Sequence, residues 1–145
     1  MTTSVRKSYF EIAKNLRRGD ILFWKKYRFS NGGQRNKYIL VLSNCITGKY
    51  YIFTLLTSKI GFYKNPYNQV DIVWLEAKKV KQLPFTTIID LKHYFSVRAS
   101  NIGEKLYEGD LKKVTELPDD MVRKIENAVK NAKTLSPRIK GLILE

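Results

Sequence analysis

The sequence predicts a β-rich α+β domain, a small antiparallel β-barrel with one helix before it and one after it. Three observations lead to this fold class. The middle of the chain holds short apolar segments rich in β-branched and aromatic residues, which favour strands. Turn-forming residues separate these segments without a helical pattern between them, as is typical of small antiparallel barrels. Helical periodicity is confined to the two ends, and 145 residues suit one domain with a single core.

The first expected element is an amphipathic helix over residues 4–16. Ser4 can cap its N-terminus. Its apolar residues recur at helical spacing; they are Val5, Tyr9, Ile12 and Leu16. Basic residues surround this stripe, and we expect the helix to lie on the edge of the domain with its charged face in solvent. A basic membrane-binding helix is the alternative, which the narrow apolar stripe disfavours.

Strands are expected after Gly19-Asp20, which breaks the first helix. The predicted strands are residues 21–25, 38–43, 50–57, 70–75 and 86–91. Thr47-Gly48-Lys49 has the composition of a tight hairpin turn between the second and third strands. Residues 61–69 contain Asn65-Pro66 and several aromatic residues, and we expect them to form a surface loop.

A second helix is expected near the C-terminus. Pro118 suits its first turn, and Asp119 and Asp120 are favourable at a helix N-terminus. Its apolar residues fall on one face; they are Met121, Val122, Ile125, Ala128, Val129 and Ala132. Ser136-Pro137 ends this helix, and residues 141–144 are expected to form a last short strand or a docking tail. Residues 97–111 carry no clear pattern.

The charge of the chain indicates its class of partner. Lys and Arg number 27 against 13 acidic residues, a net charge of +14. Such a charge predicts attraction to RNA, DNA, an anionic membrane or an acidic protein. No apolar stretch approaches the roughly 20 residues that cross a bilayer, and the N-terminus lacks the apolar part of a secretory signal. We therefore expect no membrane partner.

The cysteine and histidine content excludes other classes. Cys45 is the only cysteine, so no internal disulfide can form, and a reducing cytoplasm fits best. We expect Cys45 to be a plain buried thiol rather than a nucleophile. One cysteine and one histidine also exclude an ordinary structural zinc site. No cofactor and no metal are predicted.

Two short motifs are candidates for phosphate chemistry. Arg35 follows Gly32-Gly33-Gln34 in an expected loop, where its planar guanidinium and the glycine amides can bind one anion. The alternative is a solvated hairpin tip. Thr57-Ser58 ends an apolar strand, where a hydroxyl can donate to a phosphate oxygen or position a ribose 2′-OH. The alternative there is a hydroxyl bonded to the local backbone.

His93 and Asp90 are two further titratable candidates. His93 is the sole histidine and invites the role of general base. We expect packing or partial exposure instead, because no carboxylate is evidently placed to orient it. Asp90 interrupts an apolar run. Facing inward it would need a partner such as Arg35 or another basic group, and facing outward it would simply alternate on its strand.

Aromatic and basic residues are interleaved in two regions of the chain. The aromatic residues are Trp24, Tyr27, Phe29, Phe62, Tyr63 and Tyr67. Rings that stack on bases and cations that bind phosphates are the components of a single-stranded RNA groove. The alternative is that half of the rings fill the core. The expected RNA-binding residues are Gln34, Lys37, Ser58, Lys59, Lys25, Lys26 and Arg28.

Taken in order, these motifs resemble those of the MazF/PemK family of bacterial toxins. Arg18–Phe23 is similar to the family's Arg-Gly-Asp/Glu step into its first strand. Gly33–Asn36 resembles its Gly-x-Arg-Pro, with Asn36 in place of proline, and Leu56–Ser58 resembles the end of its third strand. Leu83–Ile89 looks like the family's strand before its dimer-forming segment, and Lys113–Met121 resembles the approach to its C-terminal helix. Ser30-Asn31 replaces the Glu-Gln that many members carry before the glycines.

The resemblance covers roughly residues 17–135 and implies one domain over residues 1–145. In that view residues 1–17 are an N-terminal helical extension, 18–135 an SH3-like barrel with its C-terminal helix, and 136–145 a tail. It implies a homodimeric, metal-independent endoribonuclease that cleaves single-stranded RNA and is neutralised by an acidic antitoxin. Arg35 and Thr57 would be the catalytic pair. The 2′-OH would attack the neighbouring phosphate and leave a 2′,3′-cyclic end.

Two other functions remain as alternatives. One is a catalytically inactive nucleic-acid-binding barrel on the same scaffold, which predicts salt-dependent binding without cut products. The other is a toxin that acts on DNA gyrase, as the related CcdB toxins do through their C-terminal residues. Leu142–Glu145 offers no convincing match to those residues.

Overall fold

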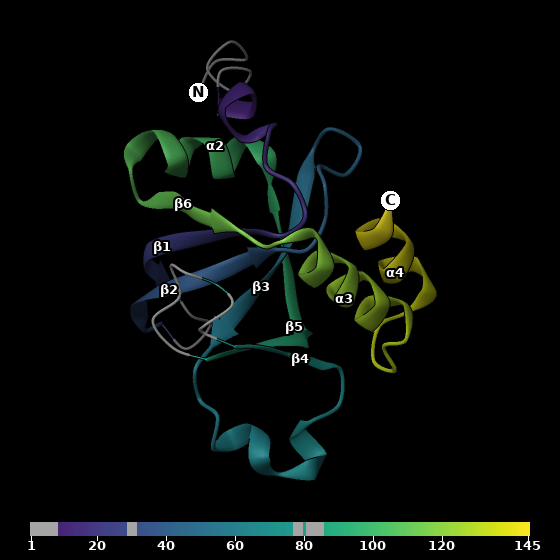
Figure 1. Ribbon diagram of the computed structural model, residues 1–145. Helices are drawn as coiled ribbons and strands as arrows, with labels where there is room; N and C mark the ends of the chain where they lie inside the picture. The colour runs from purple at the N-terminus through teal and green to yellow at the C-terminus, as the bar shows by residue number, and fades with distance from the viewer. Residues whose placement is uncertain (1–8, 29–31, 77–79, 81–85) are drawn as a thin grey trace.

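The computed structural model describes residues 9–28, 32–76, 80 and 86–145. It is an α+β structure with a curled antiparallel sheet of six strands in the order β4-β5-β3-β2-β1-β6 (Figure 1). The strands are β1 (Asp20–Arg28), β2 (Gln34–Val41), β3 (Tyr50–Thr57), β4 (Ile72–Leu75), β5 (Thr87–Arg98) and β6 (Leu111–Glu116). The helices are α2 (Ala99–Glu108), α3 (Asp119–Lys130) and α4 (Pro137–Leu144), with short 3-10 helices η1 (Phe62–Lys64) and η2 (Pro66–Asn68). Residues 9–13 are also helical.

Every pairing in the sheet is antiparallel, as the sequence predicts. β4 and β6 are its edges, and no pairing joins them within the described residues. The curled sheet is compatible with a barrel-like fold, and closure into an SH3-like barrel stays a prediction.

Both faces of the sheet are buried, because apolar residues occupy both phases of the two-residue strand repeat. Adjacent residues Ile21 and Leu22 are each fully buried, and they belong to different hydrophobic clusters. The adjacent residues Ile52 and Phe53 likewise belong to different clusters, Ile52 to the cluster of Ile21 and Phe53 to that of Leu22. We call the side that carries Ile21 and Ile52 the first face and the side that carries Leu22 and Phe53 the second face.

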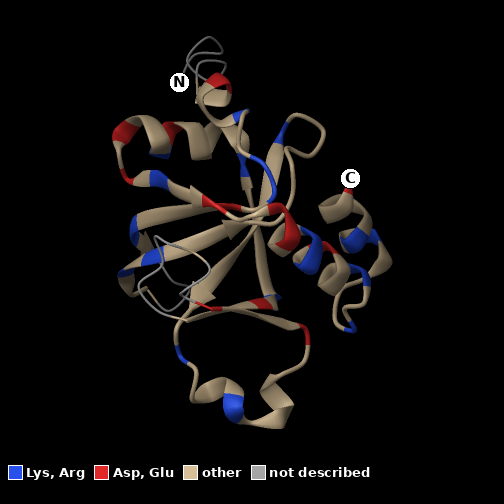
Figure 2. Cartoon of the chain, viewed as in Figure 1, with Lys and Arg blue, Asp and Glu red and all other residues tan. Residues whose placement is uncertain are grey.

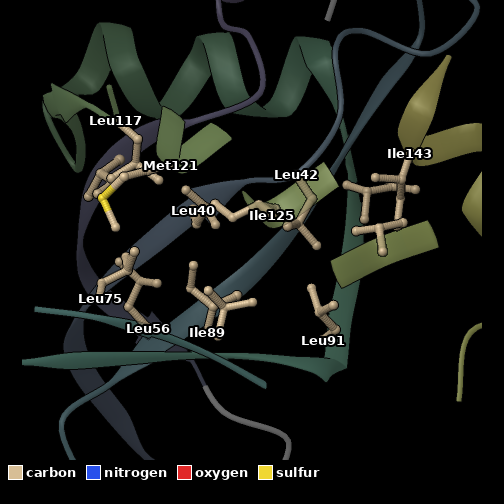
Figure 3. Packing of buried hydrophobic residues seen from close by; sticks show 14 of the residues in the cluster. Leu40, Leu42, Leu56, Leu75, Ile89, Leu91, Leu117, Met121, Ile125 and Ile143 are labelled. Carbon is tan, nitrogen blue, oxygen red and sulfur yellow. The ribbon is translucent and has the colours of Figure 1, made fainter. Parts of the chain in front are cut away.

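The first face packs against α3 and α4. Figure 3 shows Leu40, Leu42 and Ile89 of the sheet region close to Ile125 of α3 and Ile143 of α4. Ile125 and Ile143 are almost completely buried. Complete burial of one such aliphatic side chain stabilises the fold by about 1.5–3 kcal/mol, so this layer fixes the two C-terminal helices on the sheet.

The second face packs against α2 and the helical segment 9–13. Ala13, Ile102 and Tyr51 are buried together there, and the Tyr51 hydroxyl donates to the Ala13 carbonyl at 2.7 Å. Gly103 lets the two helices approach closely, because a Cβ atom at this position would lie 1.7 Å from the Tyr9 carbonyl oxygen. The described part of the predicted N-terminal helix therefore lies on the domain, as expected.

The Arg18-Gly19-Asp20 motif is a structural clamp. Arg18 donates to the Leu42 carbonyl at 3.0 Å, to Glu126 at 2.9 Å and to the Ile143 carbonyl. Gly19 has φ +98°, and a Cβ atom there would lie 2.7 Å from a Val122 methyl carbon. The motif therefore joins the start of β1 to both C-terminal helices.

Several predicted elements are confirmed. β3 has the predicted bounds, and α3 follows Pro118 as expected, with Pro118 as its N-cap residue. The turn at Thr47-Gly48 is also confirmed, since both residues have positive φ and Lys49 N–H donates to Ile46 O at 2.9 Å. Residues 61–69 form η1 and η2, which shape the predicted loop.

Other parts of the chain differ from the sequence prediction or were left open by it. Residues 97–111, which carry no clear sequence pattern, hold the end of β5 and all of α2, and β6 follows as a further strand. Residues 136–145 are not a plain tail and 141–144 are not a strand. Ser136-Pro137 instead begins α4, because the Ser136 hydroxyl caps the Ile139 amide at 3.2 Å and proline suits the first turn.

Candidate nucleic-acid interface

Arg35 lies within a strand and not in the predicted loop. It is the second residue of β2 and pairs with Tyr27 of β1, because the β1–β2 ladder continues past a bulge to Arg28 and Gln34. The Arg35 side chain is exposed. Thr57 is the last residue of β3 and is half-buried.

The strand register brings Arg35 and Thr57 to one end and one face of the sheet. The pair Ile39↔Leu55 is the last between β2 and β3, and both residues contact the second-face cluster. Arg35 lies four residues before Ile39 and Thr57 lies two residues after Leu55. Because alternate residues of a strand share a face, both side chains belong to the second face.

Two lysines complete a cluster of positive charge at this end. The pKa of the Lys37 ammonium is lowered, first by partial burial and then by the positive charges of Lys59 and Arg35. Lys37 is therefore close enough to each of the other two cations to be repelled by it. The Lys59 amide donates to the Thr57 hydroxyl at 3.2 Å. We call Arg35, Lys37, Thr57 and Lys59 the cationic site.

A β-bulge in β1 shapes the neighbouring surface. Lys25 and Lys26 lie between the pairs Trp24↔Lys37 and Tyr27↔Arg35, so two residues of β1 oppose Asn36 alone. Lys26 has φ 55°, and its amide donates to the Asn36 side-chain oxygen at 3.0 Å. Asn36, where the resembling family carries proline, thus supplies an acceptor that stabilises the bulge. Lys25 and Lys26 are both exposed.

Aromatic rings border the cationic site. The bulge returns Tyr27 to the face of Trp24, and their ring centroids lie 5.2 Å apart. Phe95 of β5 continues the row, 5.9 Å from Tyr27 and 5.7 Å from Phe53. Two members of the row pair directly across the strands with Lys37 and Arg35. Cations and half-buried rings therefore alternate on one surface, and Figure 2 shows blue at the ends of β1 and β2 away from α3.

The remaining predicted RNA-binding residues lie at the ends of β1, β2 and β3. Gln34 and Ser58 are exposed at the start of β2 and just after β3, beside the cationic site. Arg28 ends β1 and pairs with Gln34.

Among the other aromatic residues that were predicted to bind RNA, Phe62 and Tyr67 are exposed but Tyr63 is buried. Phe29, the departure at Ser30-Asn31 and residues 83–85 of the Leu83–Ile89 motif lie outside the described residues.

Asp90 faces inward and is paired, which resolves the two alternatives. Its carboxylate accepts from the Tyr63 hydroxyl at 2.8 Å and the Lys92 amide at 3.0 Å, and it lies 3.0 Å from the Lys92 ammonium. Its basic partner is therefore Lys92. Burial, together with the bond to Asp90, raises the pKa of the Tyr63 phenol. This carboxylate holds η1 against β5.

His93 has a carboxylate neighbour, contrary to the sequence expectation. Its Nε2 lies 3.6 Å from an Asp90 oxygen, and its side chain is 68% exposed. The cause is a bulge in β5, which places four residues between the pairs Thr54↔Tyr94 and Leu56↔Ile89. The Thr54 hydroxyl stabilises this bulge by donating to the Asp90 carbonyl at 2.9 Å. Sequence spacing alone gives no sign of such a bulge.

Three further findings concern metal-ligating groups, membrane-spanning helices and the cysteine. Within the described ranges, there is no group of three or more His, Cys, Asp or Glu side chains that could hold a metal ion. Among the helices of the described residues, none has the length and apolar character to cross a bilayer. Cys45 is half-buried and not fully buried as predicted, and burial raises the pKa of its thiol. A raised pKa disfavours the reactive thiolate.

Comparison with known proteins gives no family assignment. No protein-family model matches the chain, and no curated protein sequence matches it. The resemblance to MazF/PemK toxins therefore rests on the order of the motifs quoted above.

Proposed function

We propose that the protein is a metal-independent endoribonuclease that cleaves single-stranded RNA at the cationic site. One observation supports this most: an exposed guanidinium and a strand-end hydroxyl lie at the same end and on the same face of the sheet. They lie beside Lys37, whose pKa is lowered by partial burial and by the neighbouring cations. A site that concentrates positive charge in this way favours phosphate and, still more, a phosphate that gains charge during reaction.

In the proposed reaction the ribose 2′-OH attacks the adjacent phosphorus and the bond to the 5′-oxygen breaks. The 2′-OH loses its proton and the leaving 5′-oxygen gains one, so the products are a 2′,3′-cyclic phosphate and a 5′-OH. Arg35 would stabilise the pentacoordinate phosphorane and help to protonate the leaving oxygen. The hydroxyl of Thr57 would anchor a non-bridging oxygen, and Lys37 and Lys59 would bind the flanking phosphates.

The row of aromatic rings beside the cationic site would make the site prefer single-stranded RNA over a duplex. Trp24 and Tyr27 are half-buried beside Lys37 and Arg35. Unpaired bases can stack on exposed portions of such rings, and a duplex cannot offer its base faces. The homodimer, the acidic antitoxin and the SH3-like barrel belong to the proposal because the resemblance implies them, and the cytoplasmic location belongs to it because the chain has a single cysteine.

Cleavage in EDTA tests the proposal. The purified protein is incubated with a long single-stranded RNA, and the products are checked for 2′,3′-cyclic ends. We expect discrete fragments that disappear with Arg35→Ala. Arg123→Ala is the matched control, because Arg123 is an exposed arginine of α3 and lies outside the cationic site. An uncut RNA, or equal cleavage by Arg35→Ala, would remove the nuclease.

A catalytically inactive RNA-binding protein is the second candidate. The alternation of cations and rings on the second face supports binding whether or not cleavage follows. This candidate predicts steeply salt-dependent binding of single-stranded RNA without products. The same incubation, analysed for both complexes and fragments, separates the two candidates.

A further inference from the structure

A second candidate site lies on the first face of the sheet, away from the cationic site. A cavity of about 410 Å³ opens between α4, the start of β3 and the end of β5. Its lining residues are Tyr50, Ile52, Tyr94, Ser96, Val97, Arg98, Arg138, Ile139 and Leu142. It adjoins the beginning of β3, whereas Thr57 ends that strand. The two sites therefore lie on opposite faces and at opposite ends of β3.

Both walls of the cavity are fixed by the fold. On the sheet side, Arg98 pairs with Tyr50 across β5 and β3, and the Ala99 amide donates to the Lys49 carbonyl at 2.8 Å. On the helix side, the fully buried Ile143 and the bond from Arg18 to its carbonyl hold α4 in place. The cavity is thus preformed, which lowers the cost of ordering side chains when a ligand binds.

The lining of the cavity combines two positively charged side chains with apolar ones. Arg98 and Arg138 approach from opposite walls, and within the described part of the chain neither guanidinium has an ion-pair or hydrogen-bond partner. Among the described residues that line the cavity, none is acidic. The rest of the lining is partly apolar, with Ile52 of β3 buried and Ile139 and Leu142 of α4 half-buried. Two guanidinium groups without a partner among the described residues, beside an apolar part of the lining, favour a ligand with a charged end and an apolar body.

We propose that this cavity binds a small amphipathic anion, a planar or branched apolar body joined to one phosphate or carboxylate. The anionic end lies between Arg98 and Arg138, with the hydroxyls of Tyr50, Tyr94 and Ser96 as further donors. The apolar body lies on Ile139 and Leu142. The volume is within the range of roughly 300–1,000 Å³ that small-molecule sites occupy.

Titration calorimetry with two probes and one neutral control tests this proposal. The probes are adenosine 5′-monophosphate and phenylacetate, and the control is adenosine. We expect saturable binding of at least one probe and weaker or no binding of adenosine. Binding of the nucleotide alone identifies a phosphorylated ligand, and binding of phenylacetate alone identifies a carboxylate. Absence of saturable binding by both probes at ~5 mM overturns the proposal.

Charge-removing variants locate the binding. Arg98→Gln and Arg138→Gln should each weaken binding of the probe by roughly tenfold or more, the usual effect of losing a charge-assisted hydrogen bond. Arg123→Gln, on the exposed side of α3, should bind as the wild type does. Equal binding by all three variants would place the ligand elsewhere and overturn the proposal. Arg35→Ala should leave this binding unchanged, which separates the cavity from the nuclease proposal.

Discussion

Asp90 offers a sharp test of how β5 and the η1 loop are held together. Its side chain is only 3% exposed and receives hydrogen bonds from the Tyr63 hydroxyl and the Lys92 amide. Asp90→Ala removes the acceptor for both donors and the counter-charge of the Lys92 ammonium. Each buried donor without a partner costs about 1–3 kcal/mol, so we expect the free energy of unfolding to fall by about 3–5 kcal/mol.

Milder substitutions show how much of this loss of stability each interaction of Asp90 causes. Asp90→Asn retains an acceptor of the same shape and should cost only about 1–3 kcal/mol. Tyr63→Phe removes the other member of the 2.8 Å bond, and its combination with Asp90→Asn should give a coupling energy of at least about 0.5 kcal/mol. Asp120→Ala is the control, because Asp120 is exposed at the start of α3. Urea unfolding measures the stability of all five variants, Asp90→Ala included.

The phenol of Tyr63 provides a second readout. Because burial and Asp90 raise its pKa, the folded state disfavours the phenolate. Its contribution to stability is complete below the pKa of an unfolded tyrosine and is lost as the pH rises through the raised pKa. Asp90→Asn should therefore lower the pKa of Tyr63 in a spectroscopic titration. An Asp90→Ala variant within ~0.5 kcal/mol of wild type would refute the reasoning.

Three further predictions concern the cationic site and the fold. Lys37→Gln should reduce the slope of log affinity against log salt for single-stranded RNA by about 0.7, the value for one phosphate contact; an unchanged slope would contradict the site. Gly103→Ala should destabilise the protein by at least about 1–3 kcal/mol in thermal unfolding, since its Cβ would meet the Tyr9 carbonyl; an unchanged melting temperature would argue against that contact. Burial alone would raise the pKa of the Asp71 carboxyl, but hydrogen bonds from the Thr134 hydroxyl and two backbone amides lower this pKa overall. Its stabilisation is therefore present above the pKa of an unfolded aspartate and is lost as the pH falls through the lowered pKa, so Asp71→Asn should flatten the stability profile at acidic pH.

Local signals were sufficient for the elements with strong patterns. β3 is a continuous apolar run with a tight turn before it, and α3 has a helical stripe behind Pro118. α4 was also signalled, because Ser136-Pro137 is an N-cap followed by proline. The same dipeptide can end a preceding helix, and only the burial of Ile143 shows which role applies.

Other features depend on tertiary contacts that spacing does not encode. α2 contains Asn101 and Gly103, which disfavour helices locally, and it is stabilised by the buried Ile102 and the close approach of Tyr9. β6 is an edge strand whose charged residues hide a strand pattern.

The candidate site was predictable in its residues but not in its geometry. Arg35 and Thr57 follow from motif and strand-end position. Their common face follows only from the register Ile39↔Leu55, and the bulge in β1 decides that Tyr27 joins Trp24 beside the cations. The approach of His93 to Asp90 likewise depends on the bulge in β5.

The central claim is that Arg35 and Thr57 act on the same phosphate. A double-mutant cycle on single-turnover RNA cleavage, with Arg35→Ala, Thr57→Val and the double variant, tests it most directly. We expect each single variant to lose on the order of 100-fold or more in rate, and the double variant to lose little beyond the worse single one, because residues that act as a unit are not additive. Losses that simply multiply, or a Thr57→Val variant as active as the wild type, would contradict a shared phosphate site.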